Sequence, residues 1–166
     1  GTGHAVQVTQ DLMGQFEGTT LVALGDMPLL TIDSIRRLFD VHERTGAAAT
    51  CLSAVIDDPT GYGRIVREPD GDMLAEIVEH KDATEDVLRI NEVNTGLFCF
   101  DNQQLFAALA QVRNDNAQAE YYLPDTIKIM RSKGLPVAVV TARDPREGLG
   151  VNSLQQLEQL KRQSVE

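Results

Sequence analysis

The chain has 166 residues, and its 25 Asp and Glu residues outnumber its 15 Lys and Arg residues, which gives a formal net charge of −10 at pH 7. This length suits one domain with one hydrophobic core. The shares of hydrophobic residues (42%) and charged residues (24%) are ordinary for a globular domain and exclude a disordered chain. The chain shows no basic stripe and no apolar run near the ~20 residues of a membrane helix, so we expect neither a nucleic-acid partner nor a membrane partner.

The hydrophobic pattern predicts strands and helices that alternate along much of the chain. In chain order we expect a helix over residues 5–13, a buried strand over 19–25, a helix between Thr31 and Gly46, a strand over 47–56, two strands over 64–68 and 73–79 joined by a turn, a strand over 93–100, helices over 102–112 and 124–132, a strand over 135–141 and a final helix over 151–163. Thr31 and Asp101 are placed to cap the N-termini of their helices, and Gly46 is placed to end the first of them.

This order of elements predicts an α/β layered fold with a mixed, mainly parallel sheet. The two strands between residues 64 and 79 predict an antiparallel hairpin added to that sheet. A doubly wound sheet begins with a strand, whereas the first element expected here is a helix. We therefore expect the N-terminal strand of the domain to be missing, and the sheet edge it leaves would be open to pairing with another copy of the chain.

The two cysteines, Cys51 and Cys99, lie far apart in apolar segments. Their spacing fits neither a metal site nor a disulfide framework, so we expect two buried thiols. No segment has the pattern of a signal peptide. Buried, reduced cysteines are typical of cytoplasmic proteins, and we expect this protein in the cytoplasm.

An acidic residue follows the first predicted strand directly, in the segment Gly25-Asp26-Met27-Pro28. Ligands of open α/β sheets bind at the carboxyl ends of the strands. A carboxylate at that place suits Mg²⁺, which takes one or two protein oxygens and completes its shell with water and phosphate oxygens. The alternative is that Asp26 is only a turn residue before Pro28.

Two further segments have the polarity of a binding site. Gly61 and Gly63 let the backbone around Tyr62 approach a ligand closely, although a simple hairpin loop would use the same glycines. Glu79 is in phase with the apolar residues two and four positions before it in the predicted strand, so we expect it to point inward with them, either toward a sugar hydroxyl or amide or into a buried ion pair, for instance with Lys81.

A polar pair, Asn94 and Thr95, interrupts an otherwise apolar strand. A buried Asn needs several hydrogen-bonding partners, which either a sugar or a neighbouring loop would supply. The segment from Asn114 to Tyr122 is polar, ends in two tyrosines and has the composition of a lid.

Seven segments of the chain occur in a specific order. They are Gly1-Thr2-Gly3-His4-Ala5, Gly25-Asp26-Met27-Pro28-Leu29, Asp58 to Ile65, Ile77 to Ala83, Glu92-Val93-Asn94-Thr95-Gly96, Asn114 to Tyr122, and Gly150-Val151-Asn152. Over nearly the whole chain, this order resembles the uridyltransferase domain of bacterial N-acetylglucosamine-1-phosphate uridyltransferases. The loop Pro-Thr-Gly-Tyr-Gly-Arg and the segment Asn-Asp-Asn-Ala-Gln that runs into Glu-Tyr-Tyr are its most specific motifs.

The resemblance implies a Rossmann-like nucleotidyltransferase fold, of the kind found in nucleotide-diphospho-sugar transferases. It also implies that residues 1–166 are a partial uridyltransferase domain, truncated at the N-terminus. The last helix, from about residue 151, would lead toward an absent C-terminal domain, which in the family is often an acetyltransferase.

The resemblance implies nucleotide contacts near the start of the chain. Gly1 and Thr2 match positions that contact the uracil. Leu24, Gly25 and Asp26 match the segment beside the nucleotide. Four more residues match the sugar end of the site: Gly63, Glu79 and Asn94 would hold the N-acetylglucosamine and ribose, and Tyr122 would lie in the loop that closes over the sugar.

The implied activity is that of a UDP-N-acetylglucosamine diphosphorylase, which converts UTP and N-acetylglucosamine 1-phosphate into UDP-N-acetylglucosamine and pyrophosphate for cell-wall (peptidoglycan) precursor synthesis. The implied cofactor is Mg²⁺, with Asp26 and Asn152 as its catalytic ligands. The sugar phosphate is already anionic at pH 7, so the attack needs no general base, and catalysis is positioning plus neutralisation of phosphate charge.

The chain departs from the family pattern in two ways. We find no segment that matches the family's Gly-rich loop for the triphosphate, so we expect impaired activity of the isolated chain. Ala119 and Pro124 stand where the family usually has Gly and Thr, and Pro124 removes a hydroxyl and a backbone donor near the sugar. Two alternatives therefore remain: a non-catalytic sugar-nucleotide-binding fragment or split subunit, and a pyrophosphorylase for another sugar 1-phosphate.

Overall fold

The computed structural model describes residues 1–69, 73–151 and 158. The strands are β1 (Thr19–Val22), β2 (Ala49–Val55), β3 (Arg64–Arg67), β4 (Leu74–Val78), β5 (Glu92–Asp101) and β6 (Val137–Thr141). The helices are α1 (Thr2–Gln7), α2 (Gln10–Met13), α3 (Ile32–Thr45), α4 (Glu85–Leu88), α5 (Asn102–Leu109) and α6 (Asp125–Ser132), with short 3₁₀ turns η1 (His80–Asp82) and η2 (Pro145–Gly148). The predicted final helix and Asn152 lie outside the described residues, apart from positions 151 and 158 of that helix.

The sheet is organised around its longest strand, β5. One side of β5 pairs with β2 along most of its length, and β6 follows beyond β2. Two strands pair with the other side of β5. β1 pairs with the C-terminal part of β5, and Arg64 of β3 pairs with Val93 near the start of β5. The outer edge of β1 has no partner strand in the described part of the chain.

The sheet is mixed, as predicted, but the expectation of mainly parallel pairing was wrong. Among the described residues, only β2 and β6 pair in parallel, and the pairings of β5 with β1, β2 and β3 and of β3 with β4 are antiparallel. β1 and β2 do run in the same direction, as the helix between them suggests, but β5 lies between them and runs the other way. The hydrophobic patterns of β1 and β2 do not show that β5, which is distant in the sequence, lies between them.

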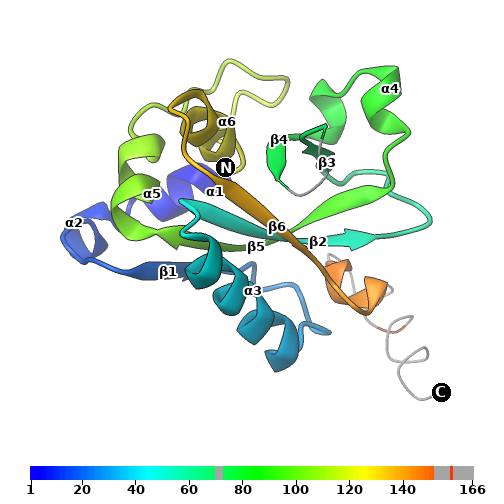
Figure 1. The fold of residues 1–166 in the computed structure, drawn as a ribbon. Coiled ribbons are helices and arrows are strands. Elements are labelled where there is room, and N and C mark those ends of the chain that lie inside the picture. The colour runs from blue at the N-terminus through cyan, green and yellow to red at the C-terminus, as the bar shows by residue number, and fades with distance from the viewer. Residues whose placement is uncertain (70–72, 152–157, 159–166) are drawn as a thin grey trace.

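Helices cover both faces of the sheet, and each face has its own core (Figure 1). α3 covers one face, where Leu38 packs with Leu52, Cys99 and other residues of β2 and β5. α5 and α6 cover the opposite face, where Phe106 and Ile127 are buried against residues that include Phe98 and Phe100 of β5. The two free cysteines are both buried, which confirms that prediction.

The predicted caps of two helices are confirmed. The Thr31 hydroxyl accepts a hydrogen bond from the Ser34 N–H at 3.2 Å, and Gly46 ends α3 in the left-handed region with φ +59°. The Asp101 carboxylate likewise accepts from the Gln104 N–H at 2.9 Å at the start of α5. These local bonds fix the ends of helices on both faces of the sheet.

The expected first helix is divided and begins earlier than predicted. It consists of α1, which starts within the predicted Gly-Thr-Gly turn, and the short α2. The Thr9 hydroxyl lies between them and donates to the Val6 carbonyl at 2.7 Å, a side-chain bond that competes with regular helix geometry. The apolar side chains of Leu12 and Phe16 beyond this break are exposed.

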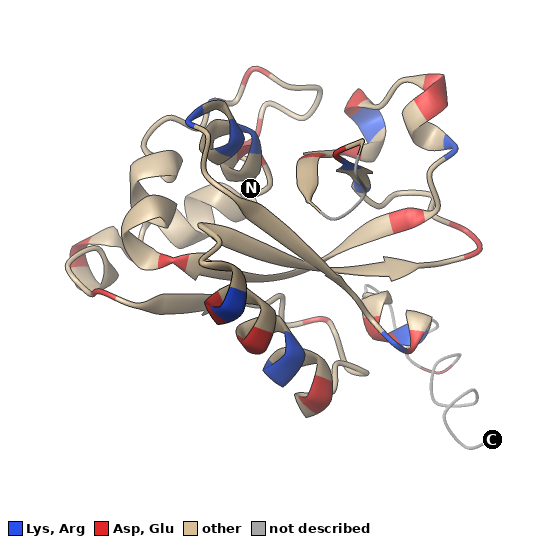
Figure 2. Cartoon of the chain, in the orientation of Figure 1, with Lys and Arg blue, Asp and Glu red and all other residues tan. Residues whose placement is uncertain are grey.

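The charged side chains of the described residues are spread over several elements. Lys and Arg residues of α3 are interspersed with acidic residues, and others lie on α6 and near η1 (Figure 2). In the described part of the chain, no helix is both long enough and apolar enough to span a bilayer.

Candidate functional site

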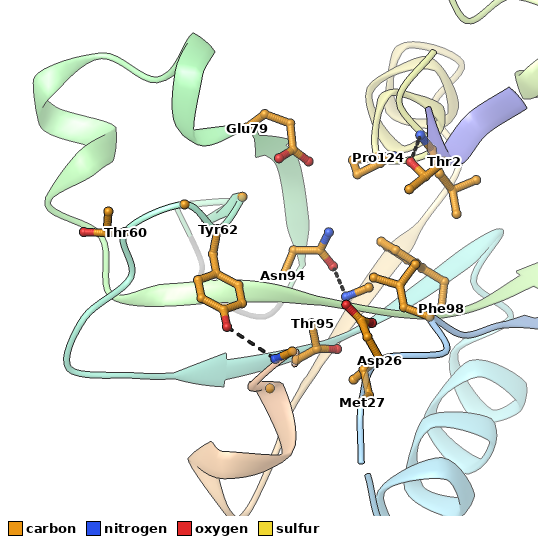
Figure 3. Close-up of a pocket in the computed structure, with 17 residues that line it drawn as sticks. Thr2, Asp26, Met27, Thr60, Tyr62, Glu79, Asn94, Thr95, Phe98 and Pro124 are labelled. Atoms are coloured by element: carbon orange, nitrogen blue, oxygen red, sulfur yellow. Dashed lines mark hydrogen bonds between the residues drawn. The ribbon is translucent and has the colours of Figure 1, made fainter. Parts of the chain in front are cut away.

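A cavity of about 370 Å³ opens where the chain leaves β1, beside the β3–β4 hairpin and over β5 (Figure 3). It draws its walls from segments that are far apart in the sequence. The lining residues are Thr2, Leu24, Asp26, Met27, Thr60, Gly61, Tyr62, Gly63, Glu79, Asn94, Thr95, Gly96, Phe98, Leu123, Pro124, Gly148 and Gly150. These described residues include two carboxylates and no Lys or Arg, so a phosphorylated ligand would require a cation from another source.

Asp26 lies on the inner wall of the cavity. Its Oδ1 atom is buried and has no hydrogen-bond partner among the described residues. Its backbone carbonyl accepts from the Val151 N–H at 2.9 Å, and its Oδ2 lies only 3.3 Å from the place where a Cβ on Gly150 would stand. A buried carboxylate oxygen without a partner is costly, and a bound cation or a ligand donor would relieve that cost.

The segment from Glu147 to Val151 forms the wall beside Asp26, and it is anchored to α3. Glu147 is buried, and its Oε2 accepts from the N–H and the hydroxyl of Thr31 at 3.1 and 2.8 Å. Gly148 follows against β2, where a Cβ would come within 2.6 Å of the Ala54 Cβ. The absence of a side chain at Gly148 therefore allows this segment to lie on the sheet.

The opposite wall is the loop before β3 together with the end of β4. A Cβ on Gly63 would lie 3.2 Å from Glu79 Oε1, so the bare backbone of Gly63 faces the carboxylate closely. Burial, followed by the negative charges of Asp125 and Asp82, raises the pKa of Glu79. The alternative of an ion pair with Lys81 is wrong, because the Lys81 ammonium donates to Gln118 Oε1 at 3.0 Å and the charges that act on Glu79 among the described residues are those of Asp125 and Asp82.

Asn94 lies on β5 at the floor of the cavity and is held by its surroundings. Its backbone N–H donates to the Gly63 carbonyl at 2.8 Å, and its Oδ1 accepts from the Gly96 N–H at 2.9 Å. The Cys51 thiol is also within reach of this oxygen, at 3.4 Å. Both alternatives for Asn94 thus fit: its oxygen makes a structural bond, and its amide nitrogen, with no acceptor among the described residues, is left to donate to a ligand.

Gly96 adopts φ +86° and makes room for a neighbouring wall residue. A Cβ at Gly96 would come within 2.4 Å of Leu24 Cδ1. Only glycine combines this backbone conformation with such a close approach, so Gly96 lets Leu24 reach the cavity from the end of β1.

The start of the chain lies against the end of the predicted lid and the residue that follows it. The Thr2 hydroxyl accepts from the Leu123 N–H at 3.1 Å, and the Gly3 N–H donates to the Tyr121 carbonyl at 2.8 Å. Thr2 lines the cavity, whereas Gly1 does not. The Tyr122 side chain is buried outside the lining, with its hydroxyl accepting from Gln118 Nε2 at 2.8 Å, and it is Pro124 that faces the cavity.

Ala119 is the only non-glycine residue of the described part with a positive φ, at +54°. A β-carbon in this left-handed conformation costs about 1–2 kcal/mol. The family that the sequence resembles usually has Gly at this position, and the backbone of this chain retains a conformation that suits Gly.

A second polar cluster, which we call the Glu92 cluster, joins β2, β3, β5 and β6 outside the cavity. It consists of Glu92, Arg67, Ser53 and Thr141. Arg67 donates to both carboxylate oxygens of Glu92, from Nε at 2.8 Å and from Nη2 at 2.6 Å. Burial alone would raise the Glu92 pKa, but the hydrogen bonds from Arg67, Ser53 and Thr141 and the charge of Arg67 outweigh it and lower this pKa.

The cavity brings together six of the ten residues that the resemblance placed in the site. They are Thr2, Leu24, Asp26, Gly63, Glu79 and Asn94. Gly1, Gly25 and Tyr122 lie outside its lining, and Asn152 lies outside the described residues. The wall made by Gly148 and Gly150 was not predicted, although the two glycines of Gly148-Leu149-Gly150 were a signal that the backbone approaches another segment closely there.

The residues present fit a magnesium ion that relies mainly on the ligand's own oxygens. No group of three or more His, Cys, Asp or Glu side chains that could hold a metal occurs in the described part of the chain. Mg²⁺ differs from metals that need such a cage, because it binds through one or two carboxylates and keeps water and phosphate as its other ligands. The unpartnered oxygen of Asp26 offers one such carboxylate.

Relatives of known name cover most of this chain. Proteins named Bifunctional protein GlmU from Shouchella clausii and Exiguobacterium sibiricum are each 53% identical over 152 residues, which is 92% of this chain and 33% and 34% of those relatives. The relative of the same name from Enterococcus faecalis is 51% identical over the same length. The chain thus spans about a third of the length of the curated relatives it matches.

Solved structures share the fold at low sequence identity. A UDP-glucose pyrophosphorylase complexed with UDP-glucose superposes with a TM-score of 0.74 at 14% identity, over 99% of this chain and 62% of that one. An apo UDP-glucose pyrophosphorylase gives 0.67 at 15% identity, over 85% and 52%. The sequence profile described as "Nucleotidyl transferase" matches residues 1–145, and the chain therefore belongs to the nucleotidyl transferase family.

Proposed function

We propose that this chain supplies the sugar-side part of a uridyltransferase that makes UDP-N-acetylglucosamine and pyrophosphate from UTP and N-acetylglucosamine 1-phosphate. The observation that carries the proposal is the cavity itself, which Asp26, Glu79 and Asn94 line together, with one buried oxygen of the Asp26 carboxylate left without a partner among the described residues. The relatives of about 50% identity support the choice of this reaction.

The polar groups of the cavity complement a sugar. The Glu79 carboxylate accepts hydrogen bonds, whereas the Asn94 amide nitrogen donates them, so a ligand between them needs one donor and one acceptor. A sugar hydroxyl or an acetamido group provides both. Thr2 and Leu24 lie farther along the wall, toward the nucleotide in this proposal.

The reaction requires positioning rather than acid–base chemistry. An anionic oxygen of the sugar phosphate attacks the α-phosphorus of UTP; a new P–O bond forms, the bond to the β-phosphate oxygen breaks, and pyrophosphate leaves with that oxygen. Mg²⁺, when bound, supplies neutralisation of phosphate charge, with Asp26 and Asn152 proposed as its protein ligands. Glu79 and Asn94 orient the sugar, and the segment from Gly148 to Gly150 lies beside the Asp26 carboxylate.

The proposal also covers the compartment of the protein and its self-association. The unpaired, buried cysteines support a reducing compartment such as the cytoplasm. The outer edge of β1, unpaired in the described residues, supports self-association through strand pairing.

The test measures binding and turnover separately. The chain is titrated with UDP-N-acetylglucosamine and Mg²⁺ in a calorimeter, and pyrophosphate release is followed with UTP, Mg²⁺ and N-acetylglucosamine 1-phosphate. We expect binding of the nucleotide sugar, with pyrophosphate release reduced or absent. Failure to bind UDP-N-acetylglucosamine at millimolar concentration would contradict the proposal.

The same titration decides between sugars. Pro124 faces the cavity where the family pattern has Thr, which favours a change in sugar recognition at this wall. UDP-glucose is therefore the matched competitor. Tighter binding of UDP-glucose than of UDP-N-acetylglucosamine would replace the proposed substrate with another sugar 1-phosphate and leave the reaction class unchanged.

A further inference from the structure

The side chain of Tyr62 spans the cavity between its two walls (Figure 3). Tyr62 belongs to the loop before β3, and its hydroxyl accepts a hydrogen bond from the Gly150 N–H at 3.3 Å, 88 residues away in the sequence. Its ring packs against the core cluster beneath α3. No other described side chain of the loop from Thr60 to Gly63 forms a hydrogen bond with the segment from Gly148 to Val151.

The backbone of Tyr62 is fixed independently of this contact. The guanidinium of the buried Arg64 donates to the Tyr62 carbonyl, and the Tyr62 N–H donates to the Pro59 carbonyl at 3.1 Å. These two hydrogen bonds hold the backbone of Tyr62 in place without the contact between its hydroxyl and Gly150.

The far end of the contact touches the carboxylate proposed to hold Mg²⁺. Gly150 lies beside the Asp26 carboxylate, since a Cβ on Gly150 would stand 3.3 Å from Asp26 Oδ2, and the next residue, Val151, donates to the Asp26 carbonyl. The other end of this segment is fixed by the bonds from Thr31 to Glu147. A change in the position of Gly150 is thus transmitted to Asp26, since the segment is held on both sides of it.

The proton of the Tyr62 hydroxyl remains available. The oxygen already accepts from Gly150, and no described residue accepts from this hydroxyl. Because Tyr62 lines the cavity, its O–H can donate to a ligand oxygen there.

We propose that Tyr62 is a positioning residue that links the sugar end of the cavity to Asp26 through Gly150. The proposal rests on the proposed function for the identity of the two ligands, Mg²⁺ and a nucleotide sugar. Each ligand, by ordering one end of the Tyr62–Gly150 contact, raises the affinity for the other, as thermodynamic linkage requires.

The variant Tyr62→Phe removes the hydroxyl and keeps the packing of the ring. We expect its affinity for Mg²⁺ alone to fall by about tenfold, as is typical when a group that orients a metal ligand is removed. We also expect the factor by which UDP-N-acetylglucosamine raises the Mg²⁺ affinity to fall about fivefold. Calorimetric titration of Mg²⁺, with and without the nucleotide sugar, measures both quantities.

Tyr121→Phe is the matched control, because Tyr121 is half-exposed, lies outside the cavity lining and uses no hydroxyl hydrogen bond within the described residues. It should bind Mg²⁺ as the unaltered chain does. Amide hydrogen exchange gives a readout that needs no ligand: the Gly150 N–H should exchange about tenfold faster in Tyr62→Phe and at an unchanged rate in Tyr121→Phe.

The outcomes separate the two proposals. Equal Mg²⁺ affinity in Tyr62→Phe and the unaltered chain, or no Mg²⁺ binding by the unaltered chain, overturns the role of Tyr62. If the unaltered chain binds Mg²⁺ but no UDP-N-acetylglucosamine, the proposed function fails. The positioning role is then decided by the Mg²⁺ titration and the exchange of Gly150.

Discussion

The Glu92 cluster and the cavity around Asp26 use the same kinds of side chain in opposite ways. Both oxygens of the Glu92 carboxylate accept hydrogen bonds, and a guanidinium balances its charge. In the cavity, Asp26 keeps a buried oxygen without a partner, and Glu79 has a raised pKa and no cation beside it in the described structure. The Glu92 carboxylate thus has its hydrogen bonds and its counter-charge from the fold itself, whereas the carboxylates of Asp26 and Glu79 have groups that a ligand could bind.

This difference separates stabilising polar residues from candidate binding residues better than burial does. Glu92 and Glu79 are both partly buried acids at strand ends, and the sequence around them is similarly acidic. What differs is the partners, which come from other strands. A buried group that the fold leaves unsatisfied costs free energy, and such cost persists where function requires it. The predictions below test this contrast, in order of expected effect.

The largest expected effect is the loss of the cation in the Glu92 cluster. Arg67→Met leaves the Glu92 carboxylate with two hydroxyl donors and no opposite charge, and should lower the free energy of unfolding by about 3 kcal/mol. Urea denaturation measures this change. The exposed pair of Arg89 and Asp86 provides the control: Arg89→Met should cost less than about 1 kcal/mol.

The pH dependence of this loss has a definite sign. The folded Glu92 pKa is lowered, so its contribution is present above the unfolded value of 4.5 and is lost as the pH falls through the folded pKa. The penalty of Arg67→Met should therefore be full at pH 7 and shrink below pH 4.5. A penalty independent of pH would show that packing of the Arg67 side chain, rather than its charge, stabilises the cluster.

Removing the charge of Asp26 should weaken ligand binding and leave stability nearly unchanged, in contrast to the loss of Arg67. Asp26→Asn deletes no internal hydrogen bond of the carboxylate, so stability should change little, whereas Mg²⁺-dependent binding of UDP-N-acetylglucosamine should weaken by about 10–100-fold. Calorimetry measures the binding, and urea denaturation measures the stability. Asp57→Asn, an exposed aspartate outside the cavity, is the control. Unchanged binding in the presence of Mg²⁺ would refute the assignment of the metal to Asp26.

A smaller effect is expected when one hydroxyl is removed from the Glu92 cluster. Ser53 donates to Glu92 Oε1 at 2.5 Å, and Thr141 and Arg67 remain as partners when Ser53 is replaced. Ser53→Ala should therefore cost about 1–2 kcal/mol, with binding unaffected. A loss as large as that of Arg67→Met would mean that the cluster fails as a unit, which the double variant would reveal as strong non-additivity.

The smallest effect should be a gain in stability at Glu79. Its folded pKa is raised by burial and by Asp125 and Asp82, so the folded state holds its proton more tightly than the unfolded state. Stability from this group is full below the unfolded value of 4.5 and falls as the pH rises toward the folded pKa. Glu79→Gln should thus stabilise the chain by about 0.5–1 kcal/mol at pH 7, and not at pH 4, while weakening nucleotide-sugar binding. Thermal unfolding at the two pH values, with Glu85→Gln as an exposed control, checks the sign.

Local structure was predictable from the sequence because local chemistry determines it. The cap at Thr31, the left-handed end at Gly46 and the cap at Asp101 each depend on residues within one helical turn, and all three were found. The inward direction of Glu79 followed from the period of a strand. The break at Thr9 was missed because the competing bond of its hydroxyl is not visible in the hydrophobic period.

Long-range features were not predictable from the residues alone. The place of β5 between β1 and β2 depends on pairings across the whole chain, and periodicity carries no information about strand order. The contact of Tyr62 with Gly150 and the wall at Gly148 likewise join segments that no local pattern relates. Asp26, Glu79 and Asn94 stood out as polar residues in or directly after predicted strands, Thr2 came from the family resemblance alone, and only the structure showed that one cavity contains all four.

The central place of β5 also has a consequence for the order in which the chain acquires structure. β1, β2 and β3 each pair with β5, yet none of the three pairs with another. During synthesis on the ribosome, these three strands therefore emerge before the strand that joins them; the β3–β4 hairpin can pair earlier, but the pairings of β1, β2 and β3 with β5 must wait for residues 92–101. A nascent chain arrested before β5 should be cleaved readily by a protease, and one arrested after α6 should resist.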